Sequence, residues 1–148
     1  MEPRVVHGKC FCGTVRFCVQ LPTLFCGHCH CSMCRRMHGA GYVTWFAVPN
    51  ERLAIQAGTQ DLVRFRSSEH GTRSFCGRCG SSLFCESTNH PDYTDIVLAN
   101  MDGAIDRQPE FHVFFDDRAE WVRVGDDLPR MGGTTGVEPR GTSKTSDQ

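Results

Sequence analysis

CHCSMC, residues 29–34, stands between two other cysteine clusters: CFC at residues 10–12 and CGRC at residues 76–79. Together these segments hold seven of the ten cysteines in the 148-residue chain. Thiolates at such short spacings can converge on one tetrahedral zinc ion, with Zn–S bonds of about 2.3 Å. One four-thiolate site leaves three cysteines, and three protein ligands with an open position is the pattern of a catalytic zinc. The spacing therefore predicts two zinc sites in one small domain.

The two outer clusters are natural partners in the closed site. Cys10 and Cys12 form a C-x-C pair, and Cys76 and Cys79 form a C-x-x-C pair. An ion held by all four would join the first strand to a later part of the sheet, so we interpret this site as structural. The alternative is a redox dithiol at Cys76 and Cys79, which have the spacing of thioredoxin-type pairs. Disulfides within the pairs are disfavoured because closure over so few residues is strained.

The middle cluster supplies the candidate catalytic ligands Cys29, Cys31 and Cys34. A free fourth position would accept water or a substrate thiol, and the charge of zinc would favour the thiolate of a thiol whose ordinary pKa is about 8.5. The site closes instead if Cys26, three residues before Cys29, or a nearby histidine supplies the fourth ligand. Both ions would then be structural and the protein a binding module. The residues alone leave both interpretations open.

Three other side chains are secondary candidates. Arg35 and Arg36 follow the middle cluster and could face an anionic substrate, or form a solvated helix face. His112 lies in an apolar segment, where it could line a pocket or be a hydrogen-bonded core histidine.

Short strands dominate the rest of the chain. Alternating or β-branched stretches predict strands at residues 42–48 and 62–66, and a hairpin of residues 110–115 and 120–124. A short helix is expected at residues 32–37, with Ser32 as its N-cap and Gly39 as its stop. We expect one domain over residues 1–128 and a disordered polar tail over residues 129–148.

Composition narrows the class of protein. A formal net charge of −1 argues against nucleic-acid binding, which favours a basic excess. There is no apolar run of the roughly 20 residues needed to span a bilayer, and no basic and apolar leader at the start. We therefore expect a cytoplasmic protein that acts on a small molecule rather than at a membrane. The sequence does not indicate its oligomeric state.

Longer stretches around the cysteines resemble a known family. GKCFCGTVRF (residues 8–17), CHCSMCRRMHGA (residues 29–40) and FCGRCGSSLF (residues 75–84) are similar to the glutathione-dependent formaldehyde-activating enzymes, a family that includes the centromere protein V-like proteins. The resemblance implies a mainly β fold, a tent-like pair of antiparallel sheets stabilised by zinc, with one short helix near the metal cluster.

The same resemblance implies two zinc ions per chain and an activity. The structural ion would be held by Cys10, Cys12, Cys76 and Cys79, and the catalytic-type ion by Cys29, Cys31 and Cys34. The implied reaction condenses glutathione with formaldehyde to S-(hydroxymethyl)glutathione, the reverse of a carbon–sulfur lyase reaction. Glutathione, or another small thiol, is thus the expected partner.

Overall fold

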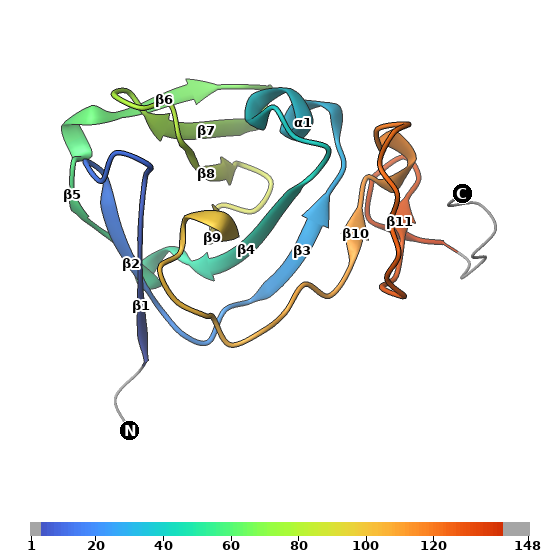
Figure 1. Ribbon diagram of the computed structural model, residues 1–148, viewed down its shortest axis with the longest axis horizontal. Coiled ribbons are helices and arrows are strands. Elements are labelled where there is room, and N and C mark those ends of the chain that lie inside the picture. The colour runs from blue at the N-terminus through green and yellow to red at the C-terminus, as the bar shows by residue number, and fades with distance from the viewer. Residues whose placement is uncertain (1–3, 141–148) are drawn as a thin grey trace. The chain divides into compact units, whose positions relative to one another are not determined.

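The computed structural model describes residues 4–140. Over these residues the protein is mainly β, with one α-helix and antiparallel sheets, which confirms the predicted fold class (Figure 1). The chain divides into two compact units, Met1–Phe25 with Trp45–Gln108 and Cys26–Thr44 with Pro109–Gln148. Among the described residues, no helix is both long and apolar enough to cross a bilayer.

The first unit contains two sheets. Strands β1 (Val5–Lys9), β2 (Arg16–Gln20) and β5 (Leu53–Ala57) form an antiparallel sheet in the order β1-β2-β5. In the other sheet β4 (Val43–Pro49), β9 (Tyr93–Val97), β8 (Ser82–Ser87), β7 (Gly71–Cys76) and β6 (Leu62–Arg66) follow one another, all antiparallel. Short 3-10 turns occupy Asn50–Arg52, Thr59–Asp61 and Leu98–Asn100.

Alternating side chains of these strands build the core of the first unit. On β2, Phe17 is fully buried, whereas Arg16 before it is exposed, as a half-buried strand requires. The Phe17 ring meets Phe84 edge-on, with ring centroids 5.0 Å apart. Gly8 lies opposite Phe17 in the strand register, and a Cβ at residue 8 would be 2.4 Å from Phe17 Cζ. Only glycine therefore leaves room for this ring between β1 and β2.

The second unit is built from short elements around one helix. It contains β3 (Phe25–Cys29), α1 (Ser32–His38), β10 (His112–Val113), a 3-10 turn (Phe115–Asp117), β11 (Met131–Gly132) and β12 (Glu138–Pro139). Strand β10 pairs with β3 in parallel, and β11 pairs with β12 antiparallel.

The predicted helix is confirmed, with one correction at its start. Helix α1 begins at Ser32, but the N-cap is Cys31, whose Sγ accepts the Cys34 backbone N–H at 3.2 Å. Ser32 was therefore wrong as the cap. Gly39 ends the helix in the left-handed conformation, with φ of 59°, as predicted.

The predicted hairpin of residues 110–115 and 120–124 is wrong. Only His112 and Val113 are in a strand, and they pair with β3 rather than with residues 120–124. Phe114 takes a left-handed φ of 53°, which ends the strand and leads into the 3-10 turn at Phe115–Asp117.

The start of the predicted tail lies within the described part of the chain. Strands β11 and β12 fall there, and the Phe114 N–H donates to the Gly136 carbonyl at 2.8 Å. Residues 141–148 lie outside the described residues. A domain over residues 1–128 with a polar tail over residues 129–148 stays a prediction.

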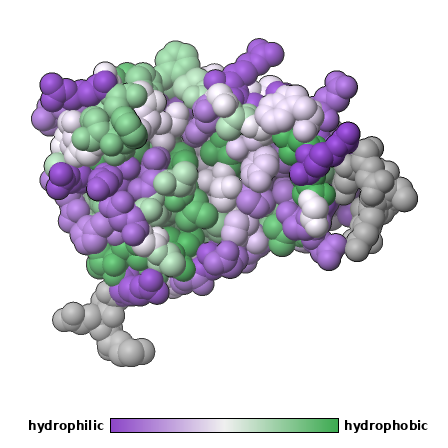
Figure 2. All heavy atoms as spheres, viewed as in Figure 1, coloured by the Kyte–Doolittle hydropathy of each residue, from purple (hydrophilic) through white to green (hydrophobic). Residues whose placement is uncertain are grey.

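The surface is chemically mixed. On the face shown in Figure 2, hydrophilic and hydrophobic side chains are interspersed.

Candidate metal centres

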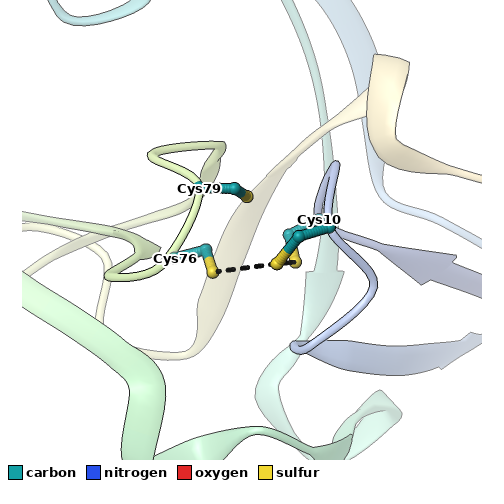
Figure 3. Close-up of side chains that lie close together, drawn as sticks. Cys10, Cys76 and Cys79 are labelled. Carbon is teal, nitrogen blue, oxygen red and sulfur yellow. Dashed lines mark hydrogen bonds between the residues drawn. The ribbon is translucent and has the colours of Figure 1, made fainter.

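Four thiols from two separate segments meet in the first unit. Cys10 follows β1, Cys76 ends β7, and Cys12 and Cys79 lie in the turns that follow. The four sulfurs lie within 4.8 Å of one another, and the measured separations are 3.6 Å for Cys10–Cys12 and 3.8 Å for Cys12–Cys76. Bonds of about 2.3 Å in a tetrahedral zinc site place the sulfurs about 3.8 Å apart. Figure 3 shows Cys10 and Cys76 directed toward one another from their two segments.

The two turns are built to hold sulfur. After Cys10, Gly13 takes φ of 79° and its N–H donates to the Cys10 carbonyl; after Cys76, Gly80 takes φ of 82° and repeats this bond. Backbone N–H groups also point at the sulfurs, from Val15 to Cys10 Sγ at 3.3 Å and from residue 78 to Cys76 Sγ at 3.4 Å. Such bonds favour thiolates, which are the form that binds metal.

Hydrogen bonds and burial separate the pKa values of these thiols. Hydrogen bonding to Ser81 lowers the pKa of Cys79 to about 5, and hydrogen bonding to Thr14 lowers the pKa of Cys12. Burial raises the pKa of Cys76 to about 11. Ser81 also joins the two segments, because its hydroxyl accepts the backbone N–H of residue 11 at 2.8 Å. This donor set of four thiols fits a divalent ion such as zinc.

Three more thiols meet in the second unit. Cys29 is the last residue of β3, Cys31 caps α1, and Cys34 lies in the first turn of the helix. All three are buried, and their sulfurs lie within 4.8 Å of one another. Hydrogen bonding to Cys31 and Cys34, followed by burial, raises the pKa of Cys29 well above its ordinary range. Buried thiols in this arrangement can ionise only with a compensating cation, which fits a metal site.

The candidate fourth ligands stand apart from this three-thiol group. Within residues 4–140 the group contains neither Cys26 nor a histidine. Cys26 is buried in β3, and its backbone N–H donates to Glu110 Oε1 at 3.0 Å.

The secondary candidates take different positions. On α1, Arg35 is half-buried with its Nε donating to the His30 carbonyl at 3.4 Å, and Arg36 is exposed. His112 is buried, and its Nε2 lies 3.0 Å from a carboxylate oxygen of Asp126.

A further group of ligand-type side chains was not predicted as a group, although His112 was named above as a secondary candidate. His28, His112 and Asp126 each offer one ligand atom, all within 4.8 Å of one another. His112 and His28 come together because β10 pairs with β3 in parallel. The spacing of residues along the chain does not reveal this pairing.

Comparison with known proteins places these sites in context. The sequence model of the "Glutathione-dependent formaldehyde-activating enzyme" family matches residues 5–117, which include all seven clustered cysteines. A Halomonas elongata protein, provisionally named as a glutathione-dependent formaldehyde-activating enzyme, is 27% identical over 127 residues, covering 81% of each chain.

A solved structure is similar as well. The crystal structure of a Rhodobacter sphaeroides protein matches with a TM-score of 0.58 and 25% identity, over 68% of this chain and 92% of that one. The family match spans most of the chain and includes both cysteine sites. The chain thus belongs to the glutathione-dependent formaldehyde-activating enzyme family.

Proposed function

We propose that this protein is a zinc-dependent enzyme that joins glutathione, or another small thiol, to formaldehyde or a small aldehyde. In this proposal Cys10, Cys12, Cys76 and Cys79 hold a structural ion, and Cys29, Cys31 and Cys34 hold the ion that meets the substrate. The observation that carries it is the three-thiol group: three buried sulfurs within 4.8 Å, in a chain of this family.

The three-thiol group has a chemical use that a four-thiol group lacks. Zinc held by three thiolates would leave one tetrahedral corner for a substrate thiol and would favour its thiolate near neutral pH. The protein's own part is to fix the geometry. Cys31 caps α1 and accepts the Cys34 N–H, so the helix start holds two of the three sulfurs in place. Positioning of this kind lowers the barrier to a two-reactant step.

The proposed reaction balances without an oxidant or reductant. The thiol gives up its proton, its sulfur attacks the aldehyde carbon, and a C–S bond forms as the C=O π bond breaks. The pair of π electrons moves to oxygen, which takes up a proton, so that glutathione and formaldehyde give S-(hydroxymethyl)glutathione. The reverse reaction is a carbon–sulfur lyase reaction.

The start of α1 also supplies positive charge. Arg35 and Arg36 come directly after Cys34, and Arg36 is exposed. Glutathione carries two carboxylates at neutral pH, which guanidinium groups bind well. We propose that Arg36 draws the peptide thiol to the three-thiol group.

The decisive test compares catalysed and uncatalysed condensation, because thiols add to formaldehyde unaided. The rate of S-(hydroxymethyl)glutathione formation is measured by NMR exchange spectroscopy for the wild type, for Cys34→Ser and for Cys18→Ser. Cys18 is a half-buried cysteine of β2 outside both clusters, so its variant is the matched control. We expect acceleration by the wild type and Cys18→Ser, and the protein-free rate with Cys34→Ser.

A wild-type rate equal to the protein-free rate would reject the enzyme. Cobalt-substituted protein then separates the remaining options. If glutathione shifts the cobalt spectrum, the protein is a carrier of the thiol; if the spectrum is unchanged, the open position does not exist and both ions are structural.

A further inference from the structure

Two histidines stand side by side in the second unit because of strand register. His112 of β10 lies directly opposite His28 of β3 in the parallel pair, so both side chains leave the same face. Their ring centroids are 4.8 Å apart, with the ring planes inclined by 34°. The Asp126 carboxylate completes the group, with its two oxygens 3.1 and 3.0 Å from His112 Nε2.

Hydrogen bonds orient each member from outside the group. His28 Nδ1 and the Thr44 hydroxyl are 2.8 Å apart, and His112 Nδ1 and His30 Nε2 are also 2.8 Å apart. When each Nδ1–H donates to these partners, the Nε2 atoms of both rings can bind a metal, which in His112 replaces the present contact with Asp126. Metal-bound histidines almost always donate their other ring N–H in this way.

The carboxylate is held in the same manner. Asp126 Oδ1 accepts the Leu128 backbone N–H at 3.0 Å and an Arg130 N–H at 3.3 Å. Hydrogen bonds to ligating carboxylates are a usual feature of metal sites. Both carboxylate oxygens also lie at hydrogen-bond distance from His112 Nε2.

We propose that His28, His112 and Asp126 form a third metal site, which binds a divalent first-row transition ion such as Zn²⁺ or Co²⁺. Two imidazoles and one carboxylate are a donor set for such ions, whereas magnesium and calcium prefer oxygen ligands alone. His112 is buried, His28 is half-buried, and the Asp126 side chain is 40% exposed, so an ion can enter from the carboxylate side. The site is separate in its ligands from both thiol groups.

A proton on His112 Nε2 competes with the metal ion for this nitrogen. Without a metal, the His112 Nε2–H donates to Asp126 at the separations given above, as in an ordinary hydrogen bond. Tetrahedral zinc with bonds of about 2.0–2.1 Å to nitrogen and oxygen would place these atoms about 3.3 Å apart. The His112–Asp126 separation would then widen by a few tenths of an ångström, while the His28 ligand atom, within 4.8 Å of the other two, would close to about the same distance.

The test counts metal ions in the full-length protein by native mass spectrometry at saturating zinc. We expect three equivalents in the wild type and two in both His28→Gln and Asp126→Asn. His70→Gln is a matched control, since His70 Nδ1 makes the same 2.8 Å contact with a threonine hydroxyl, that of Thr88, outside any ligand group. Asp127→Asn is the control for Asp126→Asn. Both control variants keep three equivalents.

Cobalt titration identifies the ligands of the third equivalent. Thiolate sites give intense sulfur-to-cobalt bands, whereas the third equivalent adds only weak ligand-field bands and is lost in His28→Gln and Asp126→Asn. Retention of the thiolate bands shows that a variant is folded. A wild type whose cobalt titration shows no equivalent lacking sulfur-to-cobalt bands overturns the proposal, as does such an equivalent that survives in either folded variant. These weak bands do not depend on the thiol sites, so the proposed function and this site can fail separately.

Discussion

Replacing Gly8 by alanine tests the close approach of β1 to β2. The new Cβ would lie 2.4 and 2.8 Å from two atoms of the Phe17 ring and 3.0 Å from the Asn100 carbonyl oxygen. Real Cβ atoms do not approach so closely, so either the ring or the strand must move. Phe17 is fully buried against Phe84, and the ring has little room to turn. Overpacking of this kind costs about 1–3 kcal/mol, and we expect Gly8→Ala to lower the free energy of unfolding by that amount.

The assay is denaturant unfolding at saturating zinc, in a wild-type and a Phe17→Leu background. Leucine lacks the ring atoms that the new methyl group would meet, so Gly8→Ala should cost less than about 1 kcal/mol in the second background, where only the Asn100 contact remains. Phe17→Leu alone should destabilise, because it leaves a gap beside Phe84. The reasoning fails if Gly8→Ala is neutral in the wild type, or if it costs the same in both backgrounds.

Three further predictions concern the sites and pH. Cys76→Ser should remove one zinc equivalent by native mass spectrometry and lower stability by at least about 3 kcal/mol, because metal binding and folding are coupled, whereas Cys18→Ser should leave zinc content unchanged. Arg36→Glu should raise the KM for glutathione several-fold, with a smaller change in kcat. Arg123 is an exposed arginine of the same unit, and Arg123→Glu should leave the KM unchanged. Equal effects of the two substitutions on KM would point to net charge instead. Burial raises the pKa of Asp95 to about 7. Between pH of about 4 and 7 the folded chain therefore holds a proton that the unfolded chain releases. The contribution of Asp95 to stability falls as pH rises through this range. Asp95→Asn should therefore gain stability relative to the wild type by up to about 3 kcal/mol between pH 5 and pH 8, and a difference independent of pH would contradict the assignment.

The sequence predicted best what depends on local spacing. Residues 62–66 were predicted as a strand and form β6, and the helix beside CHCSMC lies where its cap and stop residues indicated. The structure brings together the thiols of the two outer clusters in one group and those of the middle cluster in another, as their spacing predicted. These features are determined by residues only a few positions apart, so they are readable along the chain.

Features that depend on pairing between distant segments were not predicted. Strand β3 has the sequence FCGHC, which lacks a clear alternation, and its Gly27 is explained only by the Phe111 ring, whose Cε1 would lie 2.1 Å from a Cβ there. The hairpin prediction failed for the same reason: His112 pairs with residues more than eighty positions earlier. The group formed by His28, His112 and Asp126 follows from that pairing and was invisible without it.

The separation of the thiols along the chain has a consequence for biosynthesis. Cys12 and Cys76 are 64 residues apart in the chain. An ion that needs both thiols can therefore bind only after the whole segment between them has left the ribosome. Closing so long a loop carries an entropic penalty that only the assembled sheets can offset. The thiols of CHCSMC lie within six residues and can capture an ion as soon as they emerge. Metallation should therefore proceed in a fixed order, with the thiols of CHCSMC first and the four thiols from the two distant segments last.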